Sequence, residues 1–463
     1  MSSIEAQENR VGHHYDLGVT HSEIGRDSEA LAEYRSALHE ADQLYASISY
    51  QLGLAFKRQN RYEKALDAFE KGLDRVPDER VCLFEAGVAL NQLGRFEEAL
   101  EKLERALEHE PNRAEIYQQI GYAYRKRGWS SEAMHALERA IGLDPHRASL
   151  HRDAGVVLSK LGRSEKALSH MQEAVALQPN RAAWRDELGA LYGKTGRLQE
   201  AVDECQHAVK LEPNHPGYNH RLGLACGRLG EPEDAVRYLG RAVELSPRRA
   251  KWHADLAGAL SSLGQNEQAL SEYRRAIEHD PDEASYHYGA GRCLHRLGDS
   301  ERAMRELEQA SSLAPSHAPT HHQMGLVHEA EGRAEEALEE YQLACALAPD
   351  QGAYYRDLGA AYGRLRQRDR ALATLRKAAY LDDEADAFGQ QGIVYEDLKA
   401  YDEALEAYRR ARELGEEADG TYQFRAGVVS QRLGRNEEAV ELLRTASDLA
   451  PNDATPSYHL GLS

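Results

Sequence analysis

Small and apolar residues recur along the chain with a fixed period of about 34 residues. Alanine holds one place of this period in every cycle: Ala30, Ala65, Ala99, Ala133, Ala167, Ala201, Ala235, Ala269, Ala303, Ala337, Ala371, Ala404 and Ala439. Glycine stands twelve residues before that alanine in every cycle but one, where Ala257 replaces it. Proline repeats at the same spacing from Pro77 to Pro349, and again at Pro451. Self-similarity of this length predicts a solenoid of stacked repeats rather than separate globular domains.

We number each repeat so that the glycine column is position 8. The repeats then resemble the tetratricopeptide repeat (TPR) family, whose pattern has an aromatic residue at 4, Leu-Gly at 7–8, Tyr at 11, Ala at 20, an aromatic at 24, Ala at 27 and Pro at 32. Two repeats match it well, through Tyr355, Leu358, Gly359, Tyr362, Ala371 and Ala378, and through Tyr117, Gly121, Tyr124, Ala133, Ala140 and Pro145. The resemblance covers residues 11–463 and implies an all-α fold: a right-handed superhelical α-solenoid of stacked antiparallel helix pairs.

Each column has a physical reason within a pair of helices, A and B. Small residues at positions 8 and 20 let A and B approach closely, and alanine at 27 lets B meet the next A helix. Glycine at 15 ends helix A where φ turns positive, and proline at 32 stops helix B. Asn60, Arg366 and Lys399 replace the position-15 glycine, and we expect the stack to bend or loosen there.

The period sets the domain organisation that we predict. Residues 1–10 are expected to form a disordered tail, and residues 454–463 a partial helix A of a fourteenth repeat. Thirteen full repeats fill residues 11–453, at about 11–45, 46–79, 80–113, 114–147, 148–181, 182–215, 216–249, 250–283, 284–317, 318–351, 352–384, 385–419 and 420–453.

Composition narrows the class of function. The chain has 57 basic and 77 acidic side chains, a formal net charge of −20, which argues against a general nucleic-acid binder. No run of about 18 apolar residues occurs, so we predict no membrane insertion. The first ten residues lack the apolar core of a secretory signal. Five cysteines without a Cys-x-x-Cys spacing favour a reducing compartment, the cytoplasm.

No motif for catalysis or cofactor binding is complete. Residues 189–195 resemble a phosphate-binding loop, but three residues separate the glycines where the motif needs four, and no strand precedes them. The histidines at 317, 321, 322 and 328 lack a zinc-site spacing, so we interpret them as surface residues, with a metal role as the alternative. The cysteines stand at packing columns, where we expect buried small hydrophobes rather than reactive thiols. We therefore predict no enzyme, no cofactor and no metal.

The resemblance implies that helix A lines a concave groove through positions 2, 5, 9, 12 and 13. Basic residues dominate position 13 and recur at the other groove positions, and the candidate binding residues among them are Arg58, Arg125, Lys126, Arg152, Lys160, Lys194, His220, Arg228, Arg292, Arg296, Arg356, Arg364 and Arg432. A basic groove in an acidic protein would attract acidic partners. The alternative is that these cations only complement the helix dipole, because position 13 lies near the end of helix A.

Aromatic residues at groove positions are further candidates, because the repeat pattern does not require them there. They are Tyr50, Phe84, Tyr288 and Phe424 at position 5, and Tyr122 at position 9. Aromatic anchors often dominate the energy of a protein interface. Asparagine never occurs at position 9, so the carboxylate clamp and the asparagine ladder of other family members are not expected.

We therefore expect a non-catalytic scaffold for protein–protein interaction that binds an extended peptide or protein segment in the concave groove. The alternative is that the repeats are the regulatory or targeting part of a longer enzyme or signalling protein. The sequence stops within a helix A, after the apolar residues Leu442, Leu443 and Leu449. Either the chain is cut from something longer, or this uncapped edge docks on a partner or on a second copy.

Overall fold

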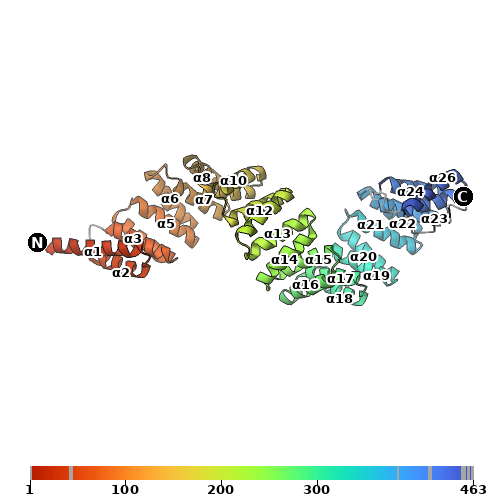
Figure 1. The fold of residues 1–463 in the computed structure, drawn as a ribbon, viewed down its shortest axis with the longest axis horizontal. Coiled ribbons are helices and arrows are strands. Elements are labelled where there is room, and N and C mark those ends of the chain that lie inside the picture. The colour runs from red at the N-terminus through yellow and green to blue at the C-terminus, as the bar shows by residue number, and fades with distance from the viewer. Residues whose placement is uncertain are drawn as a thin grey trace. The chain divides into compact units, whose positions relative to one another are not determined.

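The computed structural model describes residues 3–40, 45–382, 385–414 and 420–449, together with residues 455 and 459. These residues form 26 α-helices and no strand. Clustering of contacts along the backbone divides the chain into two compact units, Met1–Gly230 and Glu231–Ser463. We call them unit 1, with helices α1–α13, and unit 2, with helices α14–α26 (Figure 1).

The helices of unit 1 are α1 (Ser3–Glu23), α2 (Asp27–Glu40), α3 (Tyr45–Arg58), α4 (Tyr62–Arg75), α5 (Arg80–Leu93), α6 (Phe96–His109), α7 (Ala114–Arg127), α8 (Ser130–Leu143), α9 (Ala148–Lys160), α10 (Ser164–Leu177), α11 (Ala182–Lys194), α12 (Leu198–Leu211) and α13 (Pro216–Leu229). Those of unit 2 are α14 (Pro232–Leu245), α15 (Ala250–Ser262), α16 (Asn266–His279), α17 (Ala284–Arg296), α18 (Ser300–Leu313), α19 (Ala318–Ala330), α20 (Ala334–Leu347), α21 (Gly352–Arg364), α22 (Arg368–Asp382), α23 (Ala385–Asp397), α24 (Tyr401–Leu414), α25 (Thr421–Arg432) and α26 (Asn436–Leu449).

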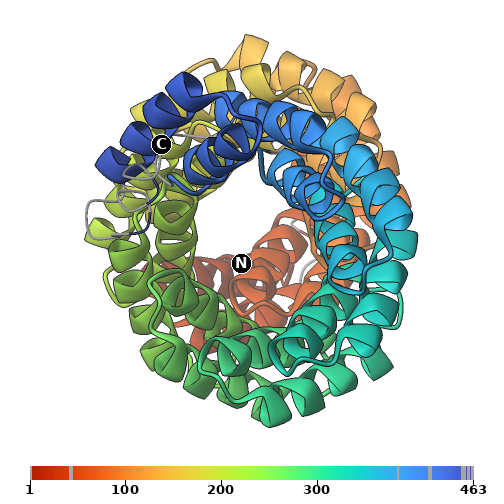
Figure 2. The same ribbon diagram turned by 90° about the vertical axis from the view of Figure 1, so that its right-hand side faces the viewer.

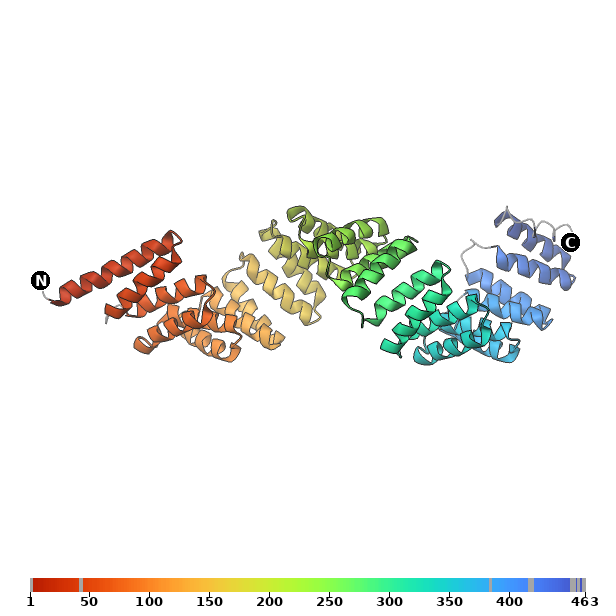
Figure 3. The same cartoon turned by 90° about the horizontal axis from the view of Figure 1, so that it is seen from below.

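Helices that follow one another in each unit pack side by side, which confirms the predicted α-solenoid of paired helices. Figure 3 shows this stacking of one helix pair after another within each unit. The predicted tail falls partly within α1, which begins at Ser3. The predicted fourteenth helix A, residues 454–463, lies outside the described residues except for Thr455 and His459.

Small residues make the close approach within each pair. A Cβ atom built on Gly53 would come within 2.3 Å of the Phe69 ring, and one on Gly87 within 2.6 Å of Leu103. The side chain at position 24 thus lies directly over the bare backbone at position 8. The alanine column at position 20 is fully buried, from Ala30 to Ala439, as its role between the helices requires.

The turn after each odd-numbered helix keeps one backbone conformation along the whole stack. Gly94, for example, has a φ of 77° and caps α5 with its backbone N–H. The three residues that replace this glycine also adopt positive φ: Asn60 at 57°, Arg366 at 58° and Lys399 at 59°. The positive-φ turn is therefore retained at these three positions, at a cost in strain for the non-glycine residues.

The acidic side chains concentrate at the starts of the even-numbered helices. Glu97 and Glu98 lie in the first turn of α6, and Glu335 and Glu336 in the first turn of α20, and all four are exposed. The positive end of the helix dipole stabilises carboxylates at this place. These carboxylate pairs therefore form a solvated face of the even-numbered helices.

Candidate binding face on the odd-numbered helices

The odd-numbered helices form the more tightly curved layer of each unit. Within the described residues, α3 contacts α5, α5 contacts α7 and α7 contacts α9 in unit 1, as α15 contacts α17 and α17 contacts α19 in unit 2. No pair of even-numbered helices in the described ranges makes comparable contact. Figure 2 shows the two layers of helices within each unit. Because neighbours on the inside of a bend lie closest, the odd-numbered helices form its concave side, which we call the odd-helix face.

The arginines of position 13 reach back to the preceding odd-numbered helix. Arg364 pairs with Glu329 at 2.6 Å, and Arg432 pairs with Glu396 at 2.8 Å. Arg296 donates to the carbonyl oxygen and the hydroxyl of Ser261 at 3.2 and 3.0 Å. Each of these partners stands at position 12 of the repeat before. These arginines therefore connect adjacent repeats.

The two remaining arginines of this column follow the same rule. Arg58 hydrogen-bonds Ser22 of α1 and lies 3.7 Å from the Asp27 carboxylate. The Arg228 guanidinium lies against Gly193 of α11, since a Cβ atom there would come within 3.4 Å of its Nη1. Contact with the preceding repeat thus explains much of the basic column, a reason that the sequence interpretation did not include.

Basic residues at position 5 are paired in the opposite direction, with the following repeat. Arg152 binds Glu187 of α11 through two hydrogen bonds of 2.5 and 2.8 Å, and it also contacts Asp153. Arg356 lies 3.0 Å from Asp357 and 3.9 Å from Asp386. These two arginines are consequently held by carboxylates of the protein itself. His220 is half-buried in α13 and also makes a polar or ring contact.

The pKa of the Asp357 carboxylate shows the effect of this pairing. His322 contacts Asp357 of the next repeat at 2.7 Å. Burial raises the pKa of Asp357, but hydrogen bonds from His322 and Arg356 outweigh burial and hold that pKa below its usual value. The charges at this point of the face are already neutralised.

Lys126, Lys160 and Lys194 are the exception in the position-13 column. They end three successive odd-numbered helices, α7, α9 and α11, and all three are exposed. In the part of the chain that the structure describes, none of them forms an ion pair. Lys126 and Arg125 lie 5.6 and 5.2 Å from the centre of the Tyr122 ring. Lys126, Lys160 and Lys194, together with Arg125 and Tyr122, form what we call the lysine stripe of unit 1.

The aromatic candidates differ in their access to solvent. Phe84 is only 8% exposed, and Arg113 lies over its ring at 4.3 Å, so Phe84 is covered by the protein itself. Tyr50 is half-buried and packs near Phe69, with ring centres 6.3 Å apart. Tyr288 lies beside Arg292 at 5.5 Å, and Phe424 beside His459. Tyr122 is the aromatic residue that lies within the lysine stripe.

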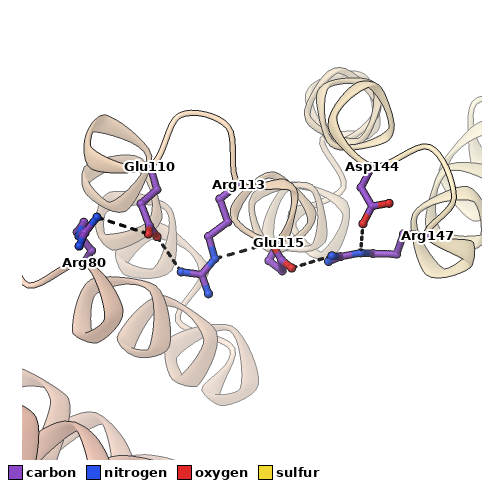
Figure 4. A network of polar contacts seen from close by, with 6 residues as sticks. All are labelled: Arg80, Glu110, Arg113, Glu115, Asp144 and Arg147. Carbon is purple, nitrogen blue, oxygen red and sulfur yellow. Dashed lines mark hydrogen bonds and ion pairs between the residues drawn. The ribbon is translucent and has the colours of Figure 1, made fainter.

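A chain of ion pairs runs along the start of the odd-numbered helices in unit 1 (Figure 4). It connects α5, α7 and α9 through distances of 2.7 to 3.9 Å between Arg80, Glu110, Arg113, Glu115, Arg147 and Asp144. Burial raises the pKa of Glu115, but the hydrogen bond from Arg147 outweighs burial and lowers it overall. The arginines at this edge are therefore also paired within the protein.

Position 4 carries a set of hydrogen bonds that the sequence interpretation missed. In six successive repeats its side chain contacts the carbonyl oxygen of the proline that ends the previous repeat, at 2.7 to 3.1 Å, through His151, Arg185, Asn219, His253, His287 and His321. Three of the histidines also contact a glutamate in the even-numbered helix of the same repeat: Glu272, Glu306 and Glu340. The signal was present in the sequence, since a polar residue replaces the expected aromatic.

This ladder corrects our interpretation of the histidine group. His321 is 5% exposed and is bonded through both ring nitrogens, so it is a buried structural residue and not a surface one. His322 is half-buried and contacts Asp357. No cluster of three or more metal-ligating side chains occurs within the described residues.

The apparent phosphate-binding loop is ordinary helix. Gly189 lies in α11 against Cys205, and the Thr195 hydroxyl donates back to the Leu191 carbonyl oxygen at 3.2 Å. All five cysteines are buried and form no disulfide, as the packing interpretation predicts. None of the helices in the described ranges is both long enough and apolar enough to cross a membrane.

Several solved structures are similar to this chain. YrrB, described as a TPR protein with an unusual peptide-binding site, shares 26% identity over 40% of this chain and 96% of its own, with a TM-score of 0.37. Cut9–Hcn1, from an APC/C hetero-tetramer, shares 14% identity over 98% and 96%, with a TM-score of 0.46. Yeast Tom70 shares 16% identity over 90% and 94%, with a TM-score of 0.44. No curated protein sequence matches the chain.

Family sequence models give the assignment. One tetratricopeptide repeat model matches residues 50–116, 152–217 and 255–318. A second matches residues 114–147, 216–249, 318–351, 385–414 and 421–453. Together they cover well over half of the chain, and they agree with the paired helices and the glycine and alanine columns described above. The chain belongs to the tetratricopeptide repeat family.

Proposed function

We propose that this chain is a non-catalytic scaffold whose odd-helix face in unit 1 binds an extended, acidic segment of a partner protein. Proteins of this family generally bind proteins or peptides. One observation carries the proposal: Lys126, Lys160 and Lys194 stand at positions where Arg364 and Arg432 have carboxylate partners, yet they have none in the described residues. Three successive repeats thus offer unneutralised charge in a row.

The chemistry of the stripe supports an acidic ligand with at least one apolar or aromatic contact. Cations on a concave surface concentrate their field and attract carboxylates. Tyr122, with Arg125 and Lys126 against its ring, provides a flat apolar surface beside two positive charges. Such rings are favoured anchors at interfaces because they bury area at little cost in conformational entropy. Five of the remaining candidate cations are less available, because carboxylates of the protein already pair with them: Arg58, Arg152, Arg356, Arg364 and Arg432.

We also propose that the chain works in a reducing compartment, the cytoplasm. All five cysteines are buried in different repeats and form no disulfide. Cysteines without disulfides in a chain of this size favour a reducing environment such as the cytoplasm. Self-association through the C-terminal edge has no such support, because most of residues 454–463 lie outside the described residues.

The test compares two triple variants of the full chain. One variant carries Lys126→Ala, Lys160→Ala and Lys194→Ala, and the control carries Lys64→Ala, Lys166→Ala and Lys210→Ala on the even-numbered helices α4, α10 and α12. The control removes the same charge from exposed lysines of the same unit. The probe is a fluorescein-labelled peptide of alternating glutamate and serine, with a lysine–serine peptide as its counterpart, and binding is measured by fluorescence anisotropy.

We expect the glutamate peptide to bind the unchanged chain and the control variant equally. Loss of the three stripe lysines should weaken it by about tenfold, with a smaller dependence on salt. Equal binding by both triple variants, or equal binding of the glutamate and lysine peptides, would contradict the proposal. Circular dichroism checks that all variants remain helical.

A further inference from the structure

The single gap in the glycine column redirects a tyrosine of unit 2. In other repeats the ring at position 24 lies over the glycine at position 8, as Tyr341 lies over Gly325 and Tyr408 over Gly392. The eighth repeat has Ala257 at that place, and the Cβ atom of Ala257 is fully buried there. Its position-24 residue, Tyr273, packs elsewhere.

Tyr273 instead reaches between two odd-numbered helices. A Cβ atom built on Gly289 of α17 would lie 2.3 Å from the Cζ atom of Tyr273, and one on Gly258 of α15 would lie 3.9 Å from its hydroxyl. The two glycines therefore leave room for the ring. Tyr273 belongs to α16 but places its hydroxyl toward the odd-helix face.

A cavity of about 220 Å³ lies at this point. Its walls come from groove positions of α15 and α17, including Ser261, Arg292 and Arg296, and Tyr273 lines it from α16. All four residues belong to unit 2. The cavity exists because glycine stands at two positions where most repeats carry a side chain.

Two positive charges line this cavity without a carboxylate partner. Neither Arg292 nor Arg296 forms an ion pair within the described ranges. Arg296 donates to Ser261, where the equivalent Arg364 meets a glutamate. Arg292 lies 5.5 Å from the centre of the Tyr288 ring. Two guanidinium groups thus lie at one cavity, and within the described residues most of their N–H groups have no hydrogen-bond acceptor.

The neutral hydroxyl group of Tyr273 also lines this cavity. Burial raises the pKa of Tyr273 to about 12, so its hydroxyl stays protonated and can donate. The Ser261 hydroxyl accepts from Arg296 and hydrogen-bonds the Cys293 thiol, so both of its roles are taken by the protein. Tyr273 also lines a second cavity, of about 410 Å³, whose walls include Asp255, Glu283 and Lys251. Charges of both signs line the second cavity, whereas the charged residues that line the first are two arginines, so the first is the better match for an anion.

We propose that the cavity between α15 and α17 binds the phosphate monoester of a phosphorylated serine or threonine in a partner segment. The inference rests on the proposed function, because it extends the binding of partner segments from the odd-helix face of unit 1 to that of unit 2. A phosphate dianion matches the two guanidinium groups of Arg292 and Arg296 in charge, and its oxygens can accept hydrogen bonds from these groups and from the Tyr273 hydroxyl. A carboxylate has one charge and fewer acceptor sites, so it should bind here more weakly.

The experiment measures a preference among three labelled peptides on the full chain. The peptides share one short glycine–serine sequence and carry phosphoserine, glutamate or serine at the centre. One variant carries Arg292→Gln and Arg296→Gln. The matched control carries Arg302→Gln and Arg305→Gln, which removes two exposed arginines of α18 in the same unit. Tyr273→Phe removes only the hydroxyl and keeps the ring.

We expect the phosphoserine peptide to bind at least about tenfold more tightly than the serine peptide, with the glutamate peptide between them. The Arg292→Gln/Arg296→Gln variant should lose the preference, the control variant should keep it, and Tyr273→Phe should reduce it by about threefold. The preference should fall as the pH drops below about 6, where the phosphate monoester gains a proton.

Three outcomes would overturn the inference. They are equal binding of the three peptides, an unchanged preference in the Arg292→Gln/Arg296→Gln variant, and displacement by inorganic phosphate at concentrations as low as those of the phosphopeptide, which would indicate a site for free phosphate. The stripe variant of unit 1 should keep the phosphoserine preference while it loses the glutamate–serine peptide. Failure of the cavity and failure of the proposed function are therefore distinguishable.

Discussion

Glycine has two separate roles in this chain, and only one of them follows from the repeat pattern. At position 15 it supplies positive φ after an odd-numbered helix, as Gly94 does, and that role is readable from its spacing. At Gly289 the reason is a neighbouring ring, Tyr273, which lies there because Ala257 occupies its usual place. Sequence columns identify each departure, but the direction that a displaced side chain takes depends on packing in three dimensions.

Gly289→Ala should destabilise the chain. The new Cβ atom would need the space of the Tyr273 ring, at 2.3 Å, and overpacking of this kind costs about 1–3 kcal/mol. Thermal unfolding followed by circular dichroism measures the effect.

Gly240→Ala is the matched control for this change. Gly240 lies in helix α14 of the same unit, and a Cβ atom there would meet nothing within 4 Å. Alanine is the better helix former, so this variant should be unchanged or more stable by up to about 1 kcal/mol. A Gly289→Ala variant as stable as Gly240→Ala would show that Tyr273 does not fill the space.

At the scale of the element, the helix pairs are predictable and their polar connections are not. The columns at positions 8, 20 and 27 reveal the pairs because small residues must recur wherever backbones approach. The contacts from Arg364 to Glu329 and from Arg432 to Glu396 span a whole repeat, and a search within one repeat cannot find them. Comparing position 13 with position 12 of the repeat before would have found both pairs, and would have singled out the unpaired lysines.

The position-4 ladder predicts which side chains can replace one another between repeats. Arg185 and His287 make the same two contacts, with a proline carbonyl oxygen and with a glutamate of the next helix. His287→Arg should therefore change the free energy of unfolding by less than about 1 kcal/mol. His287→Leu leaves the Pro281 carbonyl oxygen without its donor and should cost about 1–3 kcal/mol.

Urea unfolding of the two variants measures this difference. The slope of the free energy against urea concentration should stay the same, since the surface exposed on unfolding does not change. If His287→Arg were as costly as His287→Leu, the donors at position 4 would not be the reason for its polar character.

At the scale of the whole molecule, every helix depends on its neighbours along the stack. A TPR solenoid follows from the sequence because the period fixes which residues must touch, whereas local charge pairing decides which part of the odd-helix face is available. The net charge of −20 does not indicate the lysine stripe, because the acidic residues concentrate on the even-numbered helices. Composition also cannot separate the paired arginines from the unpaired lysines, since both count only as basic residues.

The buried cysteines report on the integrity of each unit. Burial raises the pKa of Cys82, Cys205 and Cys345 to about 12, and it also raises the pKa of Cys293. A raised pKa keeps the thiol protonated, and only the thiolate reacts. At about pH 8 the folded chain should therefore react very slowly with a colorimetric disulfide reagent, whereas all five thiols should react after unfolding in guanidinium. Fast reaction of any thiol in the folded chain would contradict this burial.

The replacement of glycine by Ala257 has a consequence for how a partner is positioned. A surface built from equal repeats offers the same contacts at every step, so a bound segment can shift by one repeat and lose little. The place where the column breaks has no equivalent one step away, because Tyr273, Gly258 and Gly289 occur together only there. A single methyl group in the helix core thus gives an otherwise periodic surface one fixed reference point, against which the alignment of a long ligand can be set.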